Sequence, residues 1–455
     1  MVTPTRRQVL AAMTAASCRR LIQAEHPTPA IHIARVSTTF EREKLRQPFG
    51  FKGGYLTELW QSLAYVQSTS GSTSVGLGTQ SVLWSDASIF NAHSEAGGNS
   101  LMFALLEYGL TIGQSIPFTT PIDWLEQVLP EVYRYGQAIT KNPNLRKTFV
   151  LNALVPMDHA AWLLYARERG LEQFDEMIPS AYQPAISFRQ AKLAVVPLIS
   201  YGVSLDEVIR LVDAGHFFLK IKIGQPGSQK EMLEQDKQRL TAIHRAIGTR
   251  ETEYTNDGRI PYYFDANGRY ETKETFCQFL DHAEKIGAFD QIILVEEPFP
   301  EHHEIDVADL GVRIAADESA HTSDDVHRRA DMGYGAVAVK GIAKTLSMTL
   351  KILEAAAERQ LPCFCADLTV NPILVDWHKN LAARMKPLPG LRVGVLETNG
   401  QQNYAGWEQM QSYHPVQHAS WQHIRNGFFD LDAEFFRESG GIYARSKHYE
   451  SLFHA

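Results

Sequence analysis

The stretch "HFFLKIKIGQ" at residues 216–225 has the composition of a buried β-strand, yet it contains two lysines. Side chains alternate between the two faces of a strand, so Lys220 and Lys222 share one face with Phe218. The aliphatic side chains between them take the other face. Charged groups are costly to bury without partners, so this stretch predicts a strand with one functional face.

Seven more short apolar runs alternate with amphipathic segments such as "LDEVIRLVDAG" at 205–215. This alternation predicts right-handed βαβ units and a parallel sheet, and eight strands in a row predict a closed barrel. The seven runs are "LAVVPLISYG" (193–202), "PYYFDANG" (261–268), "QIILVEEP" (291–298), "VRIAADES" (312–319), "AVAVKGIA" (336–343), "LPCFCADL" (361–368) and "LRVGVLETNG" (391–400).

The rest of the chain divides around this barrel, which we expect over residues 191–400. Residues 29–190 begin with strand-like pieces and continue with helical ones, which predicts an α+β capping domain. Residues 401–455 are expected to pack back on the cap. The glycine-rich stretch "FGFKGGYLTE" at 49–58 is either a mobile lid or an ordinary hairpin turn.

Three carboxylates end three successive predicted strands. Asp265, Glu296 and Asp317 are separated by 31 and 21 residues, each about one strand–helix unit. The C-terminal ends of barrel strands meet at one mouth, where such enzymes keep their chemistry. Three converging oxygen ligands suit a hard divalent cation, so we expect one Mg²⁺ per site, with Mn²⁺ as an alternative.

The lysines fall on the strands before and after these carboxylates. Lys222 and Lys340 are expected on opposite walls, so a metal-bound substrate carboxylate would place its α-carbon between two amines. One lysine would remove the α-proton, giving an enediolate, and the other could return a proton from the far side. Lys220 is expected to lower the pKa of Lys222 and to contact the substrate carboxylate.

Three more polar residues end predicted strands and are candidate substrate contacts. Asn267 follows Asp265 by two residues and should lie beside the metal or the substrate. Asp367 and Glu397 end the last two strands. For these two, hydrogen bonding to the barrel rim is the alternative.

The motifs "LKIKIG", "FDANG", "VEEP", "ADES" and "AVKGIAK" occur in this order and resemble those of the enolase superfamily. Within its mandelate racemase/muconate lactonising enzyme family, they are similar to the branch with muconate-lactonising enzymes and dipeptide epimerases. The resemblance implies a (β/α)₇β barrel with an α+β cap, usually as a homo-oligomer. It also implies Mg²⁺ on Asp265, Glu296 and Asp317, and it selects these residues over Glu297 and Glu318.

The resemblance also implies that Lys222 and Lys340 are the acid/base pair. The last strand ends in "LETNG" rather than in the Asp-x-Asp of known dipeptide epimerases. The strand before it ends in "CADL", without the histidine of the mandelate-racemase and sugar-acid dehydratase branch. These departures leave the substrate open and disfavour a His–Asp dehydratase.

The expected function is therefore Mg²⁺-dependent α-proton abstraction from a small carboxylate substrate. Racemisation or epimerisation of an amino-acid derivative is the first expectation, because two bases on opposite faces permit exchange on either side. A dehydratase or cycloisomerase, both lyases, would use the same residues and the same enediolate. A non-catalytic metal-binding barrel is the alternative from another class.

Composition and the N-terminus limit partners and location. The chain has 455 residues and a formal net charge of −8, which disfavours nucleic acid and anionic membranes as partners. It has no run of 18 apolar residues that would span a membrane. Residues 1–28 include "TPTRRQVLAAMTAASCRR", which has the layout of a twin-arginine export signal and would place the protein in the periplasm. The alternative is a disordered or helical arm on a cytoplasmic protein.

Overall fold

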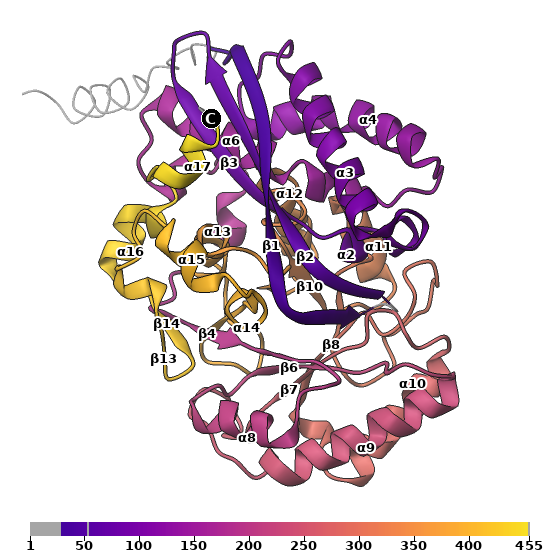
Figure 1. Ribbon diagram of the computed structural model, residues 1–455. Coiled ribbons are helices and arrows are strands. Elements are labelled where there is room, and N and C mark those ends of the chain that lie inside the picture. The colour runs from indigo at the N-terminus through magenta and orange to yellow at the C-terminus, as the bar shows by residue number, and fades with distance from the viewer. Residues whose placement is uncertain (1–28, 52–53, 454–455) are drawn as a thin grey trace, which may run out of the picture.

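A three-stranded antiparallel sheet begins the part of the chain that the computed structural model describes, residues 29–51 and 54–453. Its strands are β1 (Ile33–Phe51), β2 (Gly54–Ser68) and β3 (Thr73–Gln80), in that spatial order. The β1–β2 hairpin is long and extends from the cap to the barrel (Figure 1). Residues 49–51 and 54–58 are the paired ends of these two strands, with Phe49 opposite Leu56, and residues 52–53 lie outside the described residues.

Helices complete the cap around this sheet. They are α2 (Val82–Ser85), α3 (Ala87–Gly113), α4 (Pro121–Thr140), α5 (Lys147–Ala153), α6 (Val155–Arg169), α7 (Phe174–Met177) and the 3₁₀ turn η1 (Gln183–Ile186). The stretch "MDHAAWLLYARERG" at 157–170 lies almost wholly in α6. A Cβ on Gly76 of β3 would lie 1.9 Å from the Pro156 carbonyl oxygen, so β3 and α6 approach at backbone distance.

The predicted barrel follows, and its strands form a closed parallel ring. The strands are β4 (Lys192–Val196), β5 (Leu198–Ile199), β6 (Leu219–Lys222), β7 (Tyr262–Asp265), β8 (Ile292–Glu296), β9 (Ile314–Ala316), β10 (Ala336–Val339), β11 (Cys363–Cys365) and β12 (Gly394–Glu397). β4 pairs with β12 and β5 pairs with β6. The ring therefore closes through one segment that is interrupted at Pro197, which lacks a backbone N–H. The prediction of the fold class is confirmed.

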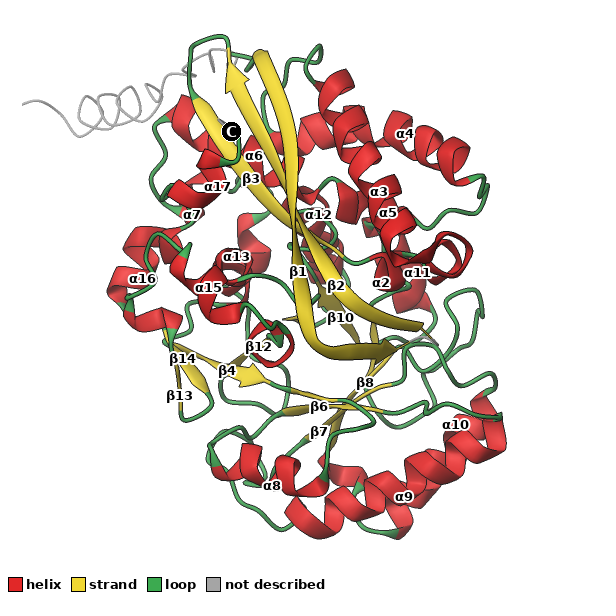
Figure 2. Ribbon diagram, viewed as in Figure 1, coloured by secondary structure: helices red, strands yellow, loops and turns green. Residues whose placement is uncertain are grey.

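Helices cover the outside of the ring, as Figure 2 shows for α8, α9 and α10 at the lower edge of the view. They are α8 (Leu205–Asp213), α9 (Gln229–Ile247), α10 (Lys273–Lys285), α11 (Ser323–Asp331), α12 (Leu346–Glu358) and α13 (Pro372–Ala382), with the 3₁₀ turn η2 (Phe289–Gln291) before β8. Residues 297–313 connect β8 to β9 without a helix. This connection leaves an open, polar loop beside the C-terminal end of β8.

The chain after the barrel contacts both parts of the molecule. It contains α14 (Gly400–Asn403), α15 (Trp407–Ser412), η3 (Ser420–Gln422), β13 (Ile424–Arg425), β14 (Phe428–Asp430), α16 (Ala433–Glu438), η4 (Ser439–Gly441) and α17 (Lys447–Ser451). β14 pairs antiparallel with β4 of the barrel. On the cap, Arg445 donates to the Thr73 hydroxyl at 2.9 Å, and His448 pairs with Glu41 at 2.9 Å.

A buried aspartate joins the cap to the barrel. Asp158 of α6 accepts hydrogen bonds from the backbone N–H groups of Leu346 and Ser347 at 2.8 and 3.1 Å, and from the Ser347 hydroxyl. These donors belong to the first turn of α12, which has no intrahelical acceptors for them. The contact fixes the cap relative to the strand that precedes α12.

Among the described residues, no helix is long and apolar enough to cross a membrane. The predicted export signal at 1–28 lies outside the described residues.

Candidate active site

The register of the barrel sets the charged residues at the same level. Lys222 lies opposite Asp265, Asp265 opposite Glu296, and Glu296 opposite Ala315. Asp317 follows Ala315 by two residues, so its side chain points to the same face as that of Ala315. The strands β6, β7, β8 and β9 therefore direct their terminal polar side chains to one side of the barrel mouth.

Lys222 and Lys220 bind these carboxylates differently. The Lys222 amine lies 2.5 Å from Asp265 Oδ2 and 2.5 Å from Asn267 Oδ1. The Lys220 amine is shared among three carboxylates, with Asp265 at 3.0 Å, Glu296 at 3.1 Å and Glu397 at 3.0 Å. Burial alone would lower the pKa of Lys220, but these carboxylates raise it well above its usual value. Lys220 is therefore a fixed positive charge under the site.

Two lysines hold Asp317 from the other side. The Lys340 amine lies 2.5 Å from Asp317 Oδ2 and 4.5 Å from the ring centre of Trp84, which belongs to α2 of the cap. Lys344 donates to the carbonyl oxygens of Asp317 and Ala320 at 2.7 and 2.9 Å. Burial would raise the pKa of Asp317, but the two ammonium groups hold it well below its usual value. Asp317 is thus ionised.

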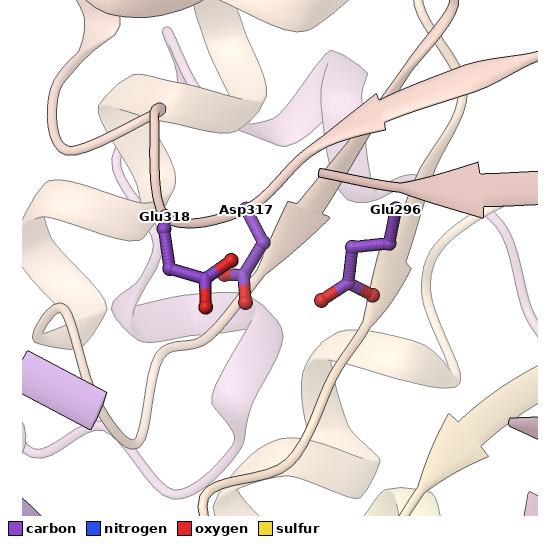
Figure 3. Close-up of side chains that lie close together, drawn as sticks. All are labelled: Glu296, Asp317 and Glu318. Atoms are coloured by element: carbon purple, nitrogen blue, oxygen red, sulfur yellow. The ribbon is translucent and has the colours of Figure 1, made fainter. Parts of the chain in front are cut away.

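Three carboxylates form a cluster that can hold a metal ion. Glu296, Asp317 and Glu318 each offer an oxygen, and these oxygens lie within 4.8 Å of one another. In Figure 3, the Asp317 and Glu318 carboxyl groups lie side by side and that of Glu296 is across from them. All three are buried. A set of oxygen donors alone fits a hard divalent cation.

This cluster differs from the predicted ligand set in one member. Glu318 joins Glu296 and Asp317, while the Asp265 carboxylate is directed to Lys220 and Lys222. Asp265 is still next to Glu296, because Lys220 contacts both carboxylates. The metal-ligand role of Asp265 stays a prediction.

Several residues around the mouth have a left-handed backbone. Asn267, Glu297 and Thr369 have φ angles of 44°, 43° and 58°, in the connections that follow β7, β8 and β11. Such φ values cost free energy for residues other than glycine, and they cluster at functional sites. Glu297 Oε2 accepts from the Asp317 backbone N–H at 2.8 Å, which fixes the turn that carries Asp317 and Glu318.

The lysines and carboxylates line a small cavity of about 50 Å³. Its opposite wall is apolar and comes mainly from the tip of the β1–β2 hairpin and from α2. The apolar lining residues are Phe49, Phe51, Leu56, Leu59, Trp84, Leu198 and Leu368. The described residues of the stretch at 49–58 therefore cover one side of the site. The choice between a mobile lid and a hairpin turn stays a prediction.

Asp367 and Glu397 line the same cavity. Glu397 Oε2 accepts from the Lys220 amine at 3.0 Å and from the Asp367 backbone N–H at 3.0 Å. Asp367 Oδ2 accepts from the Asn399 N–H at 2.7 Å, whereas no described donor reaches its Oδ1. Burial, reinforced by Glu397, raises the pKa of Asp367 to about 7. Asp367 thus offers an unused acceptor to a ligand.

All nine residues that the sequence singled out thus lie around one mouth. Sequence reasoning missed Lys344 and Trp84. Lys344 could have been noticed because it ends the motif "AVKGIAK". The structure buries it fully. Trp84 carried no such signal, because it enters the site from the cap, more than 200 residues away in sequence from Lys340.

The barrel and its carboxylate-lined mouth define a class of protein, the enolase-type barrels. Residues 204–393 match the family described as "Enolase C-terminal domain-like". This part of the chain matches that family's model, and the resemblance to the enolase superfamily is confirmed. No curated protein matches the sequence.

Solved structures share the fold across both domains. A dipeptide epimerase from Enterococcus faecalis, complexed with Mg and the dipeptide L-Leu-L-Tyr, has a TM-score of 0.58 at 17% identity, over 82% of this chain and 92% of that one. An N-succinyl Arg/Lys racemase from Bacillus cereus has a TM-score of 0.60 at 14% identity, over 89% and 93%. A mandelate racemase/muconate lactonizing enzyme from Roseiflexus sp. has a TM-score of 0.61 at 16% identity, over 90% and 98%. The chain therefore has the fold of enolase-superfamily enzymes.

Proposed function

We propose that this protein is a divalent-metal-dependent enzyme that removes and returns the α-proton of a carboxylate substrate. The proposed reaction is the racemisation or epimerisation of an amino-acid derivative. Solved structures with this fold include a dipeptide epimerase with bound Mg and an N-succinyl Arg/Lys racemase, which supports this reaction type.

The observation that carries the proposal is the placement of two lysines on opposite sides of one cavity. Lys222 ends β6, and Lys340 directly follows β10. In the ring, β7, β8 and β9 lie between these strands on one side, and β11, β12 and β4/β5 lie between them on the other. Both lysines line the cavity of about 50 Å³, so a small substrate bound there would have an amine on either face.

The buried carboxylates repel one another, and a bound metal ion would relieve this repulsion. Burial and the nearby Asp265 raise the pKa of Glu296 well above its usual value, because the two negative charges repel. We propose Mg²⁺, or Mn²⁺, on Glu296 and Asp317 with Asp265 or Glu318. A cation bound there would stabilise the negative charge that develops on the substrate carboxylate when the α-proton leaves.

The side chains of this protein divide the proton transfer between them. Lys222 accepts the α-proton on one face and Lys340 donates a proton on the other, or the reverse for the opposite stereoisomer. Asp317 now raises the pKa of Lys340, although burial alone would lower it. A cation held by the Asp317 carboxylate would weaken this stabilisation of the ammonium, which would let Lys340 act as a base.

The remaining walls indicate which substituents fit. Phe49, Phe51 and Leu56 on the hairpin offer an apolar surface to a side chain or acyl group of the substrate. Asp367 Oδ1 offers an acceptor to an N–H donor of the substrate. We propose a substrate with an amine or amide nitrogen and an apolar substituent.

Proton exchange in D₂O tests the proposal. The protein with Mg²⁺ is incubated with a panel of N-acylated amino acids, dipeptides and hydroxy acids, and NMR and mass spectrometry follow the α-proton. Lys222→Ala and Lys340→Ala are compared with Lys386→Ala, an exposed lysine. We expect exchange without other loss of mass. Each active-site change should abolish one stereochemical course, and the third change should leave both unaffected.

Two outcomes would contradict this function. Loss of water or another group would make the enzyme a lyase. Unchanged exchange of both stereoisomers in both lysine variants would remove Lys222 and Lys340 from the chemistry.

A further inference from the structure

A second cavity adjoins the carboxylate cluster from the side. It has a volume of about 650 Å³ and lies between the α4–α5 connection and the start of α3 in the cap, and the loops after β7 and β8 in the barrel. We call it the vestibule. Its walls include Ser88, Asn144 and Arg146 from the cap and Glu297, Glu301 and Glu318 from the barrel. The helix-free connection after β8 leaves this side of the mouth open.

The vestibule reaches the cluster through two residues. Glu318 lines the vestibule and also belongs to the group of three metal-binding carboxylates. Asn267 lines both the vestibule and the active-site cavity. The Asn267 amide donates to Glu318 Oε1 at 2.9 Å, and its oxygen accepts from Lys222. One amide side chain thus stands between the two cavities.

The vestibule is negatively charged. Four of its lining residues are carboxylates (Asp86, Glu297, Glu301 and Glu318), against two arginines (Arg146 and Arg269). Arg146 is paired with Glu301, which cancels one charge of each sign. Glu297 is only 1% exposed, and no described donor reaches its Oε1. A cleft with an excess of one sign concentrates ions of the other sign.

The two sides of the mouth differ in what they offer to a hydrated cation. Under the hairpin, the wall of the active-site cavity is apolar. Such a wall has no oxygen ligands to replace the waters that Mg²⁺ gives up slowly. The vestibule, at about 650 Å³, accommodates the hydrated ion until carboxylates replace its waters.

We propose that the catalytic divalent cation reaches its site through the vestibule, by way of Glu297 and Glu318, and not through the mouth beneath the β1–β2 hairpin. This inference rests on the proposed metal-dependent function. It separates the path of the ion from the path of the substrate. The ion can then exchange while the hairpin remains over the cavity.

Metal-binding kinetics test this route without a substrate. The full chain, freed of metal with a chelator, is mixed with Mn²⁺ in a stopped-flow instrument with a metallochromic dye. Dissociation is measured with excess EDTA, and the Kd by titration of the free Mn²⁺ EPR signal. Asn144→Trp and His302→Trp place a bulky ring on either wall of the vestibule, at exposed positions. Gln401→Trp is the matched control, because Gln401 is exposed and lines a different cavity that adjoins the active site at Phe49 and Leu198.

An obstructed path slows binding and release equally and leaves the equilibrium unchanged. We expect each vestibule plug to lower both rate constants by roughly tenfold, with the Kd within about twofold of the wild type. Gln401→Trp should change neither rate.

The measurements distinguish failure of the proposed route from failure of the proposed metal-dependent function. Normal rates in both vestibule variants, or slowing in Gln401→Trp instead, would overturn the route while metal binding stands. A wild type that binds no Mn²⁺ would overturn the metal-dependent function, and the route with it.

Discussion

At the scale of single residues, two histidines are buried in uncharged form behind the active-site wall. His159 of α6 stacks on Trp377, with ring centres 4.3 Å apart, and its Nδ1 contacts the Leu77 carbonyl oxygen at 3.0 Å. Burial lowers the pKa of His159 from 6.5 to about 4, and that of His378 to about 3. Neither can take up a proton without leaving its packing.

Burial of neutral His159 should therefore destabilise the fold as the pH falls below 6.5. The unfolded chain protonates His159 below pH 6.5, but the folded protein does so only near pH 4. The stabilisation is complete above pH 6.5 and is lost as the pH falls toward 4. We expect this residue to contribute roughly 2–3 kcal/mol to the fall in unfolding free energy between pH 7 and 4.5.

Urea unfolding at both pH values measures this contribution. His159→Gln should reduce the difference between the two pH values, whereas His418→Gln, at an exposed position, should not. An unchanged difference in His159→Gln would show that the histidine is protonated equally in both states.

At the scale of elements, the contact between β3 and α6 depends on one glycine. A Cβ at Gly76 would meet the Pro156 carbonyl oxygen at 1.9 Å and the Ala160 nitrogen at 2.3 Å, both backbone atoms. Neither can move without separating the strand from the helix. Gly76→Ala should lower the unfolding free energy by about 3 kcal/mol or more, measured by urea unfolding.

The matched control for Gly76→Ala is Gly202→Ala. A Cβ there meets no atom within 4 Å. The free energy should change by less than about 1 kcal/mol. Equal effects at both glycines would mean that the sheet and helix adjust freely to the extra methyl group.

The contact between Asp158 of α6 and the first turn of α12 gives a second prediction at the scale of elements. Asp158→Ala leaves two backbone N–H groups and the Ser347 hydroxyl without their buried acceptor. We expect a loss of about 3 kcal/mol or more in urea unfolding, because each unsatisfied buried donor is costly. In the control Ser204→Ala, α8 loses the hydroxyl that accepts from the exposed Glu207 N–H. This change should cost about 1 kcal/mol. A loss in Asp158→Ala no larger than in Ser204→Ala would mean that water enters the joint.

At the scale of the whole molecule, metal binding should stabilise the fold. A cation that binds only the folded state at 100 times its Kd adds about 2.7 kcal/mol to the unfolding free energy. Calorimetry with Mg²⁺ should show Tm higher than with EDTA by roughly 2–5 °C. Glu296→Gln removes a buried carboxylate of the cluster and should abolish the shift.

Glu304→Gln is the control for this shift, because it removes an exposed carboxylate of the nearby loop. It should retain the full increase in Tm. A shift that survives in Glu296→Gln but not in Glu304→Gln would place the ion in the loop and not in the barrel.

The sequence by itself determined the barrel and the positions of its charged strand ends. Strand–helix alternation and side-chain parity are local properties, readable from a few residues such as 219–222. Parallel strands end at a common edge, so parity also placed Lys222, Asp265 and Glu296 at one level before any contact was known. The family motifs added which carboxylates to expect as ligands.

The tertiary structure decided what surrounds these residues. It placed Trp84 and the hairpin over the cavity, Glu318 beside Asp317, and a vestibule beside a connection without a helix. These features arise between segments far apart in the chain, where backbone packing such as that at Gly76 fixes the distance. No local pattern encodes them, because they depend on how the cap and the barrel close on each other. The strand patterns therefore predicted the chemical groups of the site, whereas only the folded molecule shows how the site is reached.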